Sequence, residues 1–222
     1  MNFFYPEKPL YLECNLPEDL FEQLKKDIDS EENSKIPWNM QLAGNIANEY
    51  AMIHANLKFI EFIENKATQF FKKDREIVLS KDNKKILDEP NDYDIKLTLE
   101  SLWINKQKKY EFNPIHSHSG LVSFVCWVKI PYNLEDEMNS NNCKKSNMPR
   151  NSLFEFIHTD LHGSIREQPI MVDKSYEGKC LFFNSQTLHQ VYPFYTSDDY
   201  RISISGNFEI IENKKTNKIS YS

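Results

Sequence analysis

GKCLFFNSQTLHQVYPFYTSDDYRISISGNFEI, residues 178–210, is the most informative part of the chain. It contains three candidate strands, 179–183, 188–194 and 200–210, because apolar, aromatic and β-branched residues occur there in short runs or in alternation with polar ones. The turn-forming residues TSDD lie before the last strand. This pattern predicts a sheet of short strands, in which 188–194 and 200–206 pair as a hairpin about residue 197.

The same period of two extends back to about residue 94. It predicts further strands at 96–104, 121–131, 152–158 and 164–172, with a long polar loop at 133–151 that we expect to be partly mobile and to act as a lid or remain unstructured. Seven or more short strands after a helical segment favour a jelly-roll sandwich or barrel over alternating βαβ units.

The first hundred residues have a helical pattern instead. Apolar residues recur at three- and four-residue spacing over 16–28 and 56–73, which predicts two amphipathic helices with one buried face each. We therefore expect a mainly β fold with N-terminal helices (α+β). The organisation predicted is a single domain over 1–222, with a helical lead-in (1–93), a β core (94–210) and a flexible tail (211–222).

Composition excludes several classes of protein. The 222 residues carry a formal net charge of −6, which argues against a sequence-independent nucleic-acid binder. No apolar run of 18 residues and no leader pattern is present, so we expect a cytoplasmic protein without a membrane span. The four cysteines lack CxxC spacing, which favours reduced thiols over a zinc site or a disulfide framework.

A histidine pair precedes the strand at 121–131. In EFNPIHSHSG (111–120), the side chains of His116 and His118 lie on one side of an extended segment, because successive residues of a strand alternate faces. Two imidazoles make half of a metal site, and His189 in the late strand 188–194 is the candidate third ligand. Neutral imidazole suits iron, zinc, copper and nickel alike. A hydrogen-bonded pair of turn residues is the alternative.

A rival metal motif lies in FIHTDLHG, where His158 and Asp160 form a literal HxD and His162 follows. Only 31 positions separate His158 from His189, which leaves little chain for the intervening strands, so we favour the pair at 116 and 118. The alternative for HTDLH is a strand end and turn in which Asp160 caps backbone donors.

Arg201 follows His189 by 12 positions, in the next predicted strand. Arginine binds a carboxylate through a planar, charge-assisted pair of hydrogen bonds, so a small dicarboxylate fits between this guanidinium and a metal held by the histidines. An edge-strand charge is the alternative.

We further expect Trp103 and Trp127 in the core or pocket wall, and Asn105, Tyr110 and Asn113 near the pocket.

Five segments carry a resemblance to a known family: the helical preface, SLWIN (101–105), EFNPIHSHSG, SFVCWVKIPY (123–132) and the block at 178–208. Together they resemble the 2-oxoglutarate/Fe(II) oxygenases of bacteria and phages, in the branch whose proximal motif is HxHxG. The resemblance covers about the last 125 residues. It implies a double-stranded β-helix (a jelly-roll, cupin-like fold), Fe(II) held by His116, His118 and His189, and 2-oxoglutarate anchored by Arg201 and Ser203. Most of the superfamily has HxD or HxE at the proximal motif, so His118 is either a ligand or an outer hydrogen-bonding partner.

The resemblance implies an Fe(II)- and 2-oxoglutarate-dependent dioxygenase, most simply a hydroxylase. Two alternatives remain at the level of sequence: a three-histidine cupin-type dioxygenase that does not use 2-oxoglutarate, and a non-catalytic jelly-roll binding module. The sequence does not reveal the prime substrate, which we expect to be a small molecule or a peptide.

Overall fold

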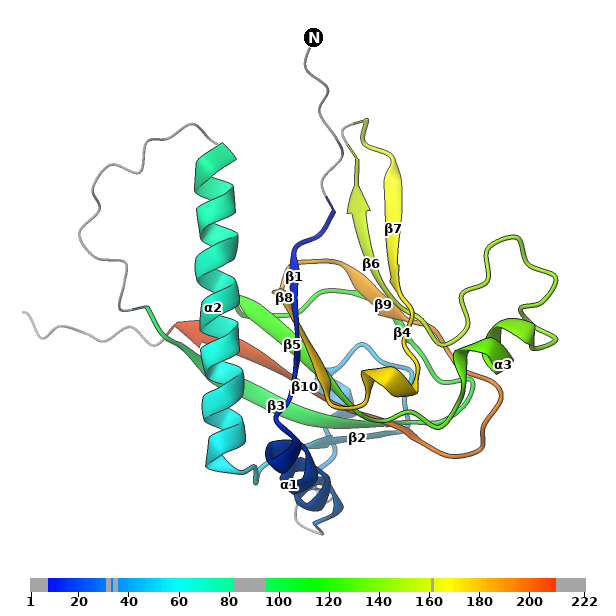
Figure 1. The fold of residues 1–222 in the computed structure, drawn as a ribbon, viewed down its shortest axis with the longest axis horizontal. Helices are drawn as coiled ribbons and strands as arrows, with labels where there is room; N and C mark the ends of the chain where they lie inside the picture. Colours follow the sequence, from blue (N-terminus) through cyan, green and yellow to red (C-terminus); the bar gives the residue numbers. More distant parts are fainter. Residues whose placement is uncertain (1–7, 31–32, 34–35, 82–94, 161, 211–222) are drawn as a thin grey trace, which may run out of the picture.

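The computed structural model describes residues 8–30, 33, 36–81, 95–160 and 162–210. Two antiparallel sheets form the centre of the molecule (Figure 1). The first has six strands in the order β1-β8-β5-β10-β3-β2, and the second has four in the order β4-β9-β6-β7. In the six-stranded sheet the strands are β1 (Tyr11–Asn15), β8 (Lys179–Asn184), β5 (Val122–Lys129), β10 (Arg201–Ile210), β3 (Leu97–Gln107) and β2 (Asn48–Ala51). The four-stranded sheet contains β4 (Asn113–His116), β9 (His189–Val191), β6 (Phe154–Thr159) and β7 (Ile165–Ile170).

Both faces of the six-stranded sheet are buried, which explains why β5 and β8 have continuous apolar runs. Phe124, Cys126 and Phe182 pack into a core on one face of the sheet. Trp127 and Phe183, which alternate with them, pack into a second core on the other face. A single strand therefore contributes to two different cores.

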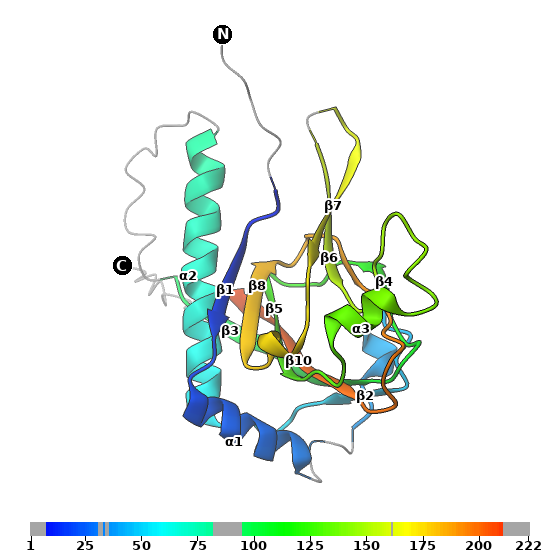
Figure 2. The same ribbon diagram turned by 45° about the vertical axis from the view of Figure 1, so that its right-hand side comes forward.

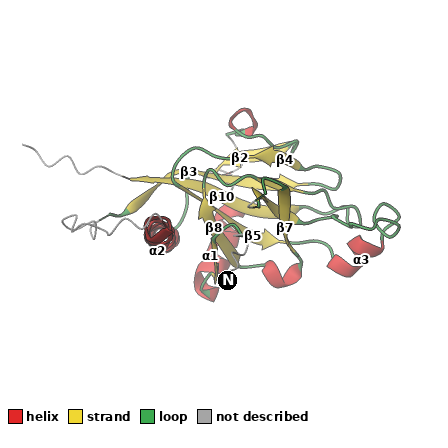
Figure 3. Cartoon of the chain, turned by 90° about the horizontal axis from the view of Figure 1, so that it is seen from above, coloured by secondary structure: helices red, strands yellow, loops and turns green. Residues whose placement is uncertain are grey.

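Two helices cover the outer face of this sheet. α1 (Glu18–Asp29) buries Leu20, Leu24 and Ile28, as the spacing of its apolar residues predicts. α2 (Leu57–Lys81) contacts β3, β5 and β8 and lies along the sheet, as Figures 1 and 2 show. Seen from above, α2 is viewed nearly end-on beside the strands (Figure 3). The two predicted helices are thus confirmed, and α2 is longer than predicted.

The four-stranded sheet faces the inner side of the six-stranded one, so the mainly β, double-stranded β-helix fold with helical support is confirmed. Phe154, Phe156 and Phe194 fill much of the space between the sheets. The remaining space is a cavity of about 390 Å³ lined by both sheets. All seven predicted strands are present, with shifted ends.

The predicted hairpin of 188–194 with 200–206 is wrong. β9 pairs with β4 and β6, whereas β10 pairs with β3 and β5 in the other sheet. The connection crosses between the sheets, and Phe194 within it is fully buried in the core between them. Burial of this aromatic side chain therefore decides the path, and the TSDD sequence alone does not produce a tight turn.

Among the strands and α-helices of the described residues, four were not predicted: β1, β2, β4 and the short helix α3 (Leu134–Asn139). β1 and β2 lie in the segment expected to be helical and form the two edges of the six-stranded sheet. α3 lies in the expected loop at 133–151, where Glu137 is fully buried. That part of the segment is therefore packed against the protein.

The predicted tail at 211–222 lies outside the described residues. Within the parts of the chain that the structure describes, no helix is long and apolar enough to cross a membrane. All four cysteines are free thiols, and Cys126 is fully buried, as expected of a packed thiol.

Candidate metal and carboxylate site

The three predicted histidines lie together at the cavity. His116 on β4 and His189 on β9 are register partners in the four-stranded sheet, and the centroids of their rings are 4.2 Å apart. The ring of His118 lies 4.9 Å from that of His116 and 5.0 Å from that of His189. One ligand atom from each residue falls within 4.8 Å of the others. Among the described residues this is the one such cluster found.

The backbone around the pair explains how both side chains reach the cavity. The β4–β9 register shifts between Asn113 and His116, and such an irregularity lets these two side chains, three positions apart, both face the cavity. The amide of His118 donates to Ser185 O at 2.9 Å. Gly120 then turns the chain into β5 with a φ of 82°, and a Cβ there would lie 2.9 Å from Phe208 O. The final glycine of HxHxG is therefore required sterically.

Backbone carbonyls fix the tautomers of two of the imidazoles. His116 Nδ1 lies 2.7 Å from Pro114 O, and His189 Nδ1 lies 2.9 Å from Thr187 O. Because a carbonyl only accepts, each Nδ1 carries the proton and donates, which leaves Nε2 with its lone pair in the neutral ring. Such outer hydrogen bonds orient metal-ligating histidines in proteins.

Burial keeps all three imidazoles neutral. It lowers the pKa of His116, and it lowers that of His118 to about 3, with a further contribution from His116. Burial also lowers the pKa of His189 well below its ordinary value, since this side chain is packed against Phe154 and Phe183. Neutral imidazoles are the form that binds a metal ion, so this donor set fits Fe(II).

Arg201, the predicted carboxylate anchor, lines the same cavity and is 3% exposed. Its guanidinium makes five hydrogen bonds, all to neutral oxygens. Gln107 Oε1 accepts from Nε and Nη2, Tyr132 Oη and Ser152 O accept from Nη1, and Tyr192 O accepts from Nη2 at 3.3 Å. No carboxylate pairs with this cation within the described ranges.

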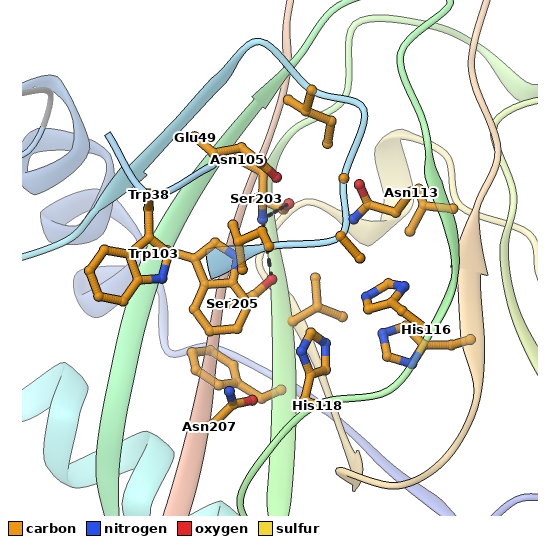
Figure 4. A pocket seen from close by; sticks show the side chains of 18 of the residues that line it. Trp38, Glu49, Trp103, Asn105, Asn113, His116, His118, Ser203, Ser205 and Asn207 are labelled. Carbon is orange, nitrogen blue, oxygen red and sulfur yellow. Dashed lines mark hydrogen bonds between the residues drawn. The ribbon is translucent and has the colours of Figure 1, made fainter. Parts of the chain in front are cut away.

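The strand β10 presents a polar row to the cavity. Arg201, Ser203, Ser205 and Asn207 occupy alternate positions and all line it. Asn105 on β3 donates through Nδ2 to the hydroxyls of Ser203 and Ser205, each at 3.4 Å (Figure 4). The hydroxyl of Ser203, predicted to anchor the cosubstrate, is thus held two positions from the guanidinium.

The rival motif is a capped turn. Asp160 Oδ1 accepts from the amides of His162 and Ser164, and Oδ2 forms an ion pair of 2.7 Å with Arg166. These bonds lower the pKa of the Asp160 carboxyl. Neither histidine of this segment belongs to the metal-ligand cluster found among the described residues.

The expected wall residues Trp103, Trp127, Asn105 and Asn113 line the cavity. Tyr110 does not, because its side chain is 62% exposed. Sequence reasoning missed Gln107 and Tyr132, which are hydrogen-bond partners of Arg201. It also missed the buried carboxyl of Glu49 on β2. No local motif marks them, since each comes from a segment distant in sequence from Arg201 and is recognisable only from its place in the folded protein.

A family model described as "Putative 2OG-Fe(II) oxygenase" matches residues 101–207, which span β3 to β10 and include every predicted site residue. These residues belong to the 2-oxoglutarate/Fe(II) oxygenases. That family uses Fe(II) and 2-oxoglutarate as cofactors, and the three-histidine cluster fits Fe(II). No curated protein matches this chain at a significant level.

Solved structures give a distant likeness. A prolyl-4-hydroxylase from Pseudomonas putida aligns with 12% identity and a TM-score of 0.49, over 90% of the oxygenase and 91% of that chain. A prolyl hydroxylase from Trichoplax adhaerens, in complex with a hypoxia inducible factor peptide fragment, aligns with 11% identity and a TM-score of 0.44, over 90% and 83%. A 2OG-Fe(II) oxygenase family oxidoreductase from Burkholderia pseudomallei aligns with 12% identity and a TM-score of 0.37, over 52% and 46%. None of these values supports an argument about substrate.

Proposed function

We propose that the protein is a hydroxylase in which His116, His118 and His189 bind Fe(II), and Arg201 and Ser203 bind the distal carboxylate of 2-oxoglutarate. The reaction consumes the C–H bond of a substrate, dioxygen and 2-oxoglutarate, and yields the C–OH product, succinate and carbon dioxide. Bound Fe(II) supplies the activation of dioxygen that this oxidation needs.

One observation carries the proposal: three neutral imidazoles converge at a cavity that is also lined by a buried guanidinium without an acidic partner in the described residues. The charge of a buried cation is costly unless it is paired. A ligand carboxylate would supply the missing negative charge. Since all the guanidinium N–H groups already have acceptors, the carboxylate would replace the longest bond, from Nη2 to Tyr192 O at 3.3 Å.

The protein's own residues contribute orientation and exclusion of water. Gln107 and Tyr132 hold the guanidinium in one position, and Asn105 holds the Ser203 hydroxyl. The phenyl rings of Phe154 and Phe183 pack against His189 and keep that side of the site dry. We include His118 among the ligands because its ring faces both other imidazoles at similar distances.

The test is to measure, by calorimetry and without oxygen, the binding of 2-oxoglutarate to the Fe(II)-loaded protein. Arg201→Ala is expected to weaken binding by at least tenfold, because it removes a charge-assisted pair. Ser203→Ala is expected to weaken it less, since it removes one neutral hydrogen bond. Arg166→Ala, which removes a guanidinium outside the cavity, is the control and should bind normally.

Turnover is tested separately with carboxyl-labelled 2-oxoglutarate, Fe(II) and oxygen. Release of labelled carbon dioxide, lost in His116→Ala, is expected. Unchanged affinity for 2-oxoglutarate in Arg201→Ala would contradict the assignment of the anchor, and absence of bound Fe(II) in the unmodified protein would contradict the metal site.

A further inference from the structure

Glu49 is a buried carboxyl group with no assigned role at the same cavity. Its side chain is 1% exposed and lines the cavity from β2, next to Asn105 on β3 in the sheet register. Oε2 accepts from Asn39 Nδ2 at 3.3 Å, while Oε1 has no hydrogen-bond partner in the described part of the chain. Burial, with a contribution from Glu111, raises the pKa of this carboxyl to about 7.

Two more acceptor oxygens at the cavity are also without a partner among the described residues. They are Oδ1 of Asn105 and Oδ1 of Asn113, both buried. A Cβ placed on Gly44 would lie 2.5 Å from Asn113 Oδ1 and 2.8 Å from Glu49 Oε1, so these two oxygens lie beside the same backbone position. Figure 4 shows Glu49, Asn105 and Asn113 on one side of the cavity, drawn above His116 and His118.

This side of the cavity accepts hydrogen bonds and favours positive charge. Apart from Arg201, the charged side chains that line it in the described ranges are Glu49 and Glu100. Three indole rings, those of Trp38, Trp103 and Trp127, also line the cavity, and the face of an indole attracts cations. A neutral apolar substrate would displace water from these acceptors and leave them unpaired, which is costly.

We propose that the substrate presents a protonated nitrogen group, an ammonium or a guanidinium, which donates to Glu49, Asn105 and Asn113 and so orients the substrate toward the histidine cluster. This inference rests on the proposed function of the site. The ligand class follows from three buried acceptor oxygens without a partner at one cavity, one of them from a carboxyl without a counter-ion in the described residues. Arg201 on β10 binds the anionic cosubstrate, whereas Glu49 binds the cationic substrate. The opposite charges of these two side chains direct each ligand to its own part of the cavity.

The experiment measures binding of five probes to protein loaded with Fe(II) and 2-oxoglutarate without oxygen. The cationic probes are N-acetyl-L-arginine amide and N-acetyl-L-lysine amide, and their neutral counterparts are N-acetyl-L-citrulline amide and N-acetyl-L-norleucine amide. At least one cationic probe is expected to bind ten to a hundred times more tightly than its counterpart, because a charged hydrogen bond is lost in the neutral one. L-norleucine amide tests whether an α-ammonium is the recognised group.

Glu49→Gln preserves the shape of the side chain. It is expected to reduce the ratio of affinities for the cationic probe and its neutral counterpart by at least tenfold, while binding of 2-oxoglutarate persists. Glu22→Gln, an exposed carboxyl on α1 that is paired with Lys25, is the matched control and should keep the preference. Should Glu49→Gln fail to fold, Asn113→Ser is measured instead, with the same expectation of a weakened preference.

The two proposals fail in different ways. If the unmodified, Fe(II)-loaded protein did not bind 2-oxoglutarate, the proposed function itself would be overturned. Normal 2-oxoglutarate binding with no advantage for any cationic probe, or an unchanged preference in Glu49→Gln, would overturn this inference alone. Stimulation of succinate release by the cationic probe, and not by its neutral counterpart, would support it.

Discussion

At the scale of single residues, the site is built from side chains whose charge state burial has changed. The imidazoles of the cluster have lowered pKa values and stay neutral, while the carboxyl of Glu49 has a raised one. Both shifts have the same cause, since burial disfavours the charged form of either group. Residues with such shifts in one cavity are characteristic of functional sites.

Glu49 gives a pH-dependent prediction. Its pKa rises from 4.5 to about 7 on folding, so the folded state holds the proton to higher pH and this group destabilises the fold progressively from pH 4.5 to 7, and fully above. Glu49→Gln is therefore expected to increase the free energy of unfolding by about 1–3 kcal/mol at pH 8 and very little at pH 5. Urea denaturation at the two pH values measures this.

The ligand-free protein is used for that measurement, and Glu22→Gln serves as the control, with no difference between the two pH values. Equal stability of Glu49→Gln and the unmodified protein at pH 8 would show that the carboxyl is solvated rather than buried.

At the scale of elements, buried hydrogen bonds position segments that have no regular structure of their own. Glu137 on α3 accepts from the amides of Tyr195 and Thr196 and from the Thr196 hydroxyl. This carboxylate ties α3 to the connection that crosses between the two sheets. The crossing in turn positions Arg201 at the start of β10.

Glu137→Ala is expected to lower the free energy of unfolding by about 2–4 kcal/mol, because it leaves the amides of Tyr195 and Thr196 without their shared acceptor. Denaturant unfolding gives the value. Glu135→Ala, an exposed carboxyl on the same helix, should change it by less than about 0.5 kcal/mol. Similar stability of the two variants would contradict the role assigned to Glu137.

Gly206 shows how closely β10 packs against its neighbours. A Cβ there would lie 2.5 Å from Ser101 O and 2.8 Å from a ring carbon of Phe124. Gly206→Ala is expected to destabilise the protein by about 1–3 kcal/mol through overpacking. Thermal unfolding compared with Glu209→Ala, an exposed position on the same strand, tests this; a melting temperature as high as that of the control would contradict it.

At the scale of the whole molecule, a metal bound between segments distant in sequence should stabilise the fold. Fe(II) at a hundred times its dissociation constant, without oxygen, is expected to add about 2.7 kcal/mol to the free energy of unfolding. His116→Ala should abolish this gain, and His162→Ala, which changes an exposed histidine outside the cluster, should retain it. Stabilisation by Fe(II) that survives in His116→Ala would place the metal elsewhere.

The sequence by itself determined the helices α1 and α2, the seven main strands and the choice of the five candidate site residues, because these depend on local periodicity and on residue chemistry. β1, β2, β4 and α3 could not be predicted, since they are short and are stabilised by pairing or burial against distant segments. The domain organisation and the roles of the site residues remain predictions.

Only the tertiary structure decided which sheet each strand joins and what surrounds the site. The chain between His189 and Arg201 crosses from one sheet to the other, and burial of Phe194 in the core between them stabilises this path. Pairing of β10 with β3, and of β3 with β2, brings Gln107 and Glu49 to the cavity. Their contribution arises from long-range packing, which leaves no periodic trace in the sequence.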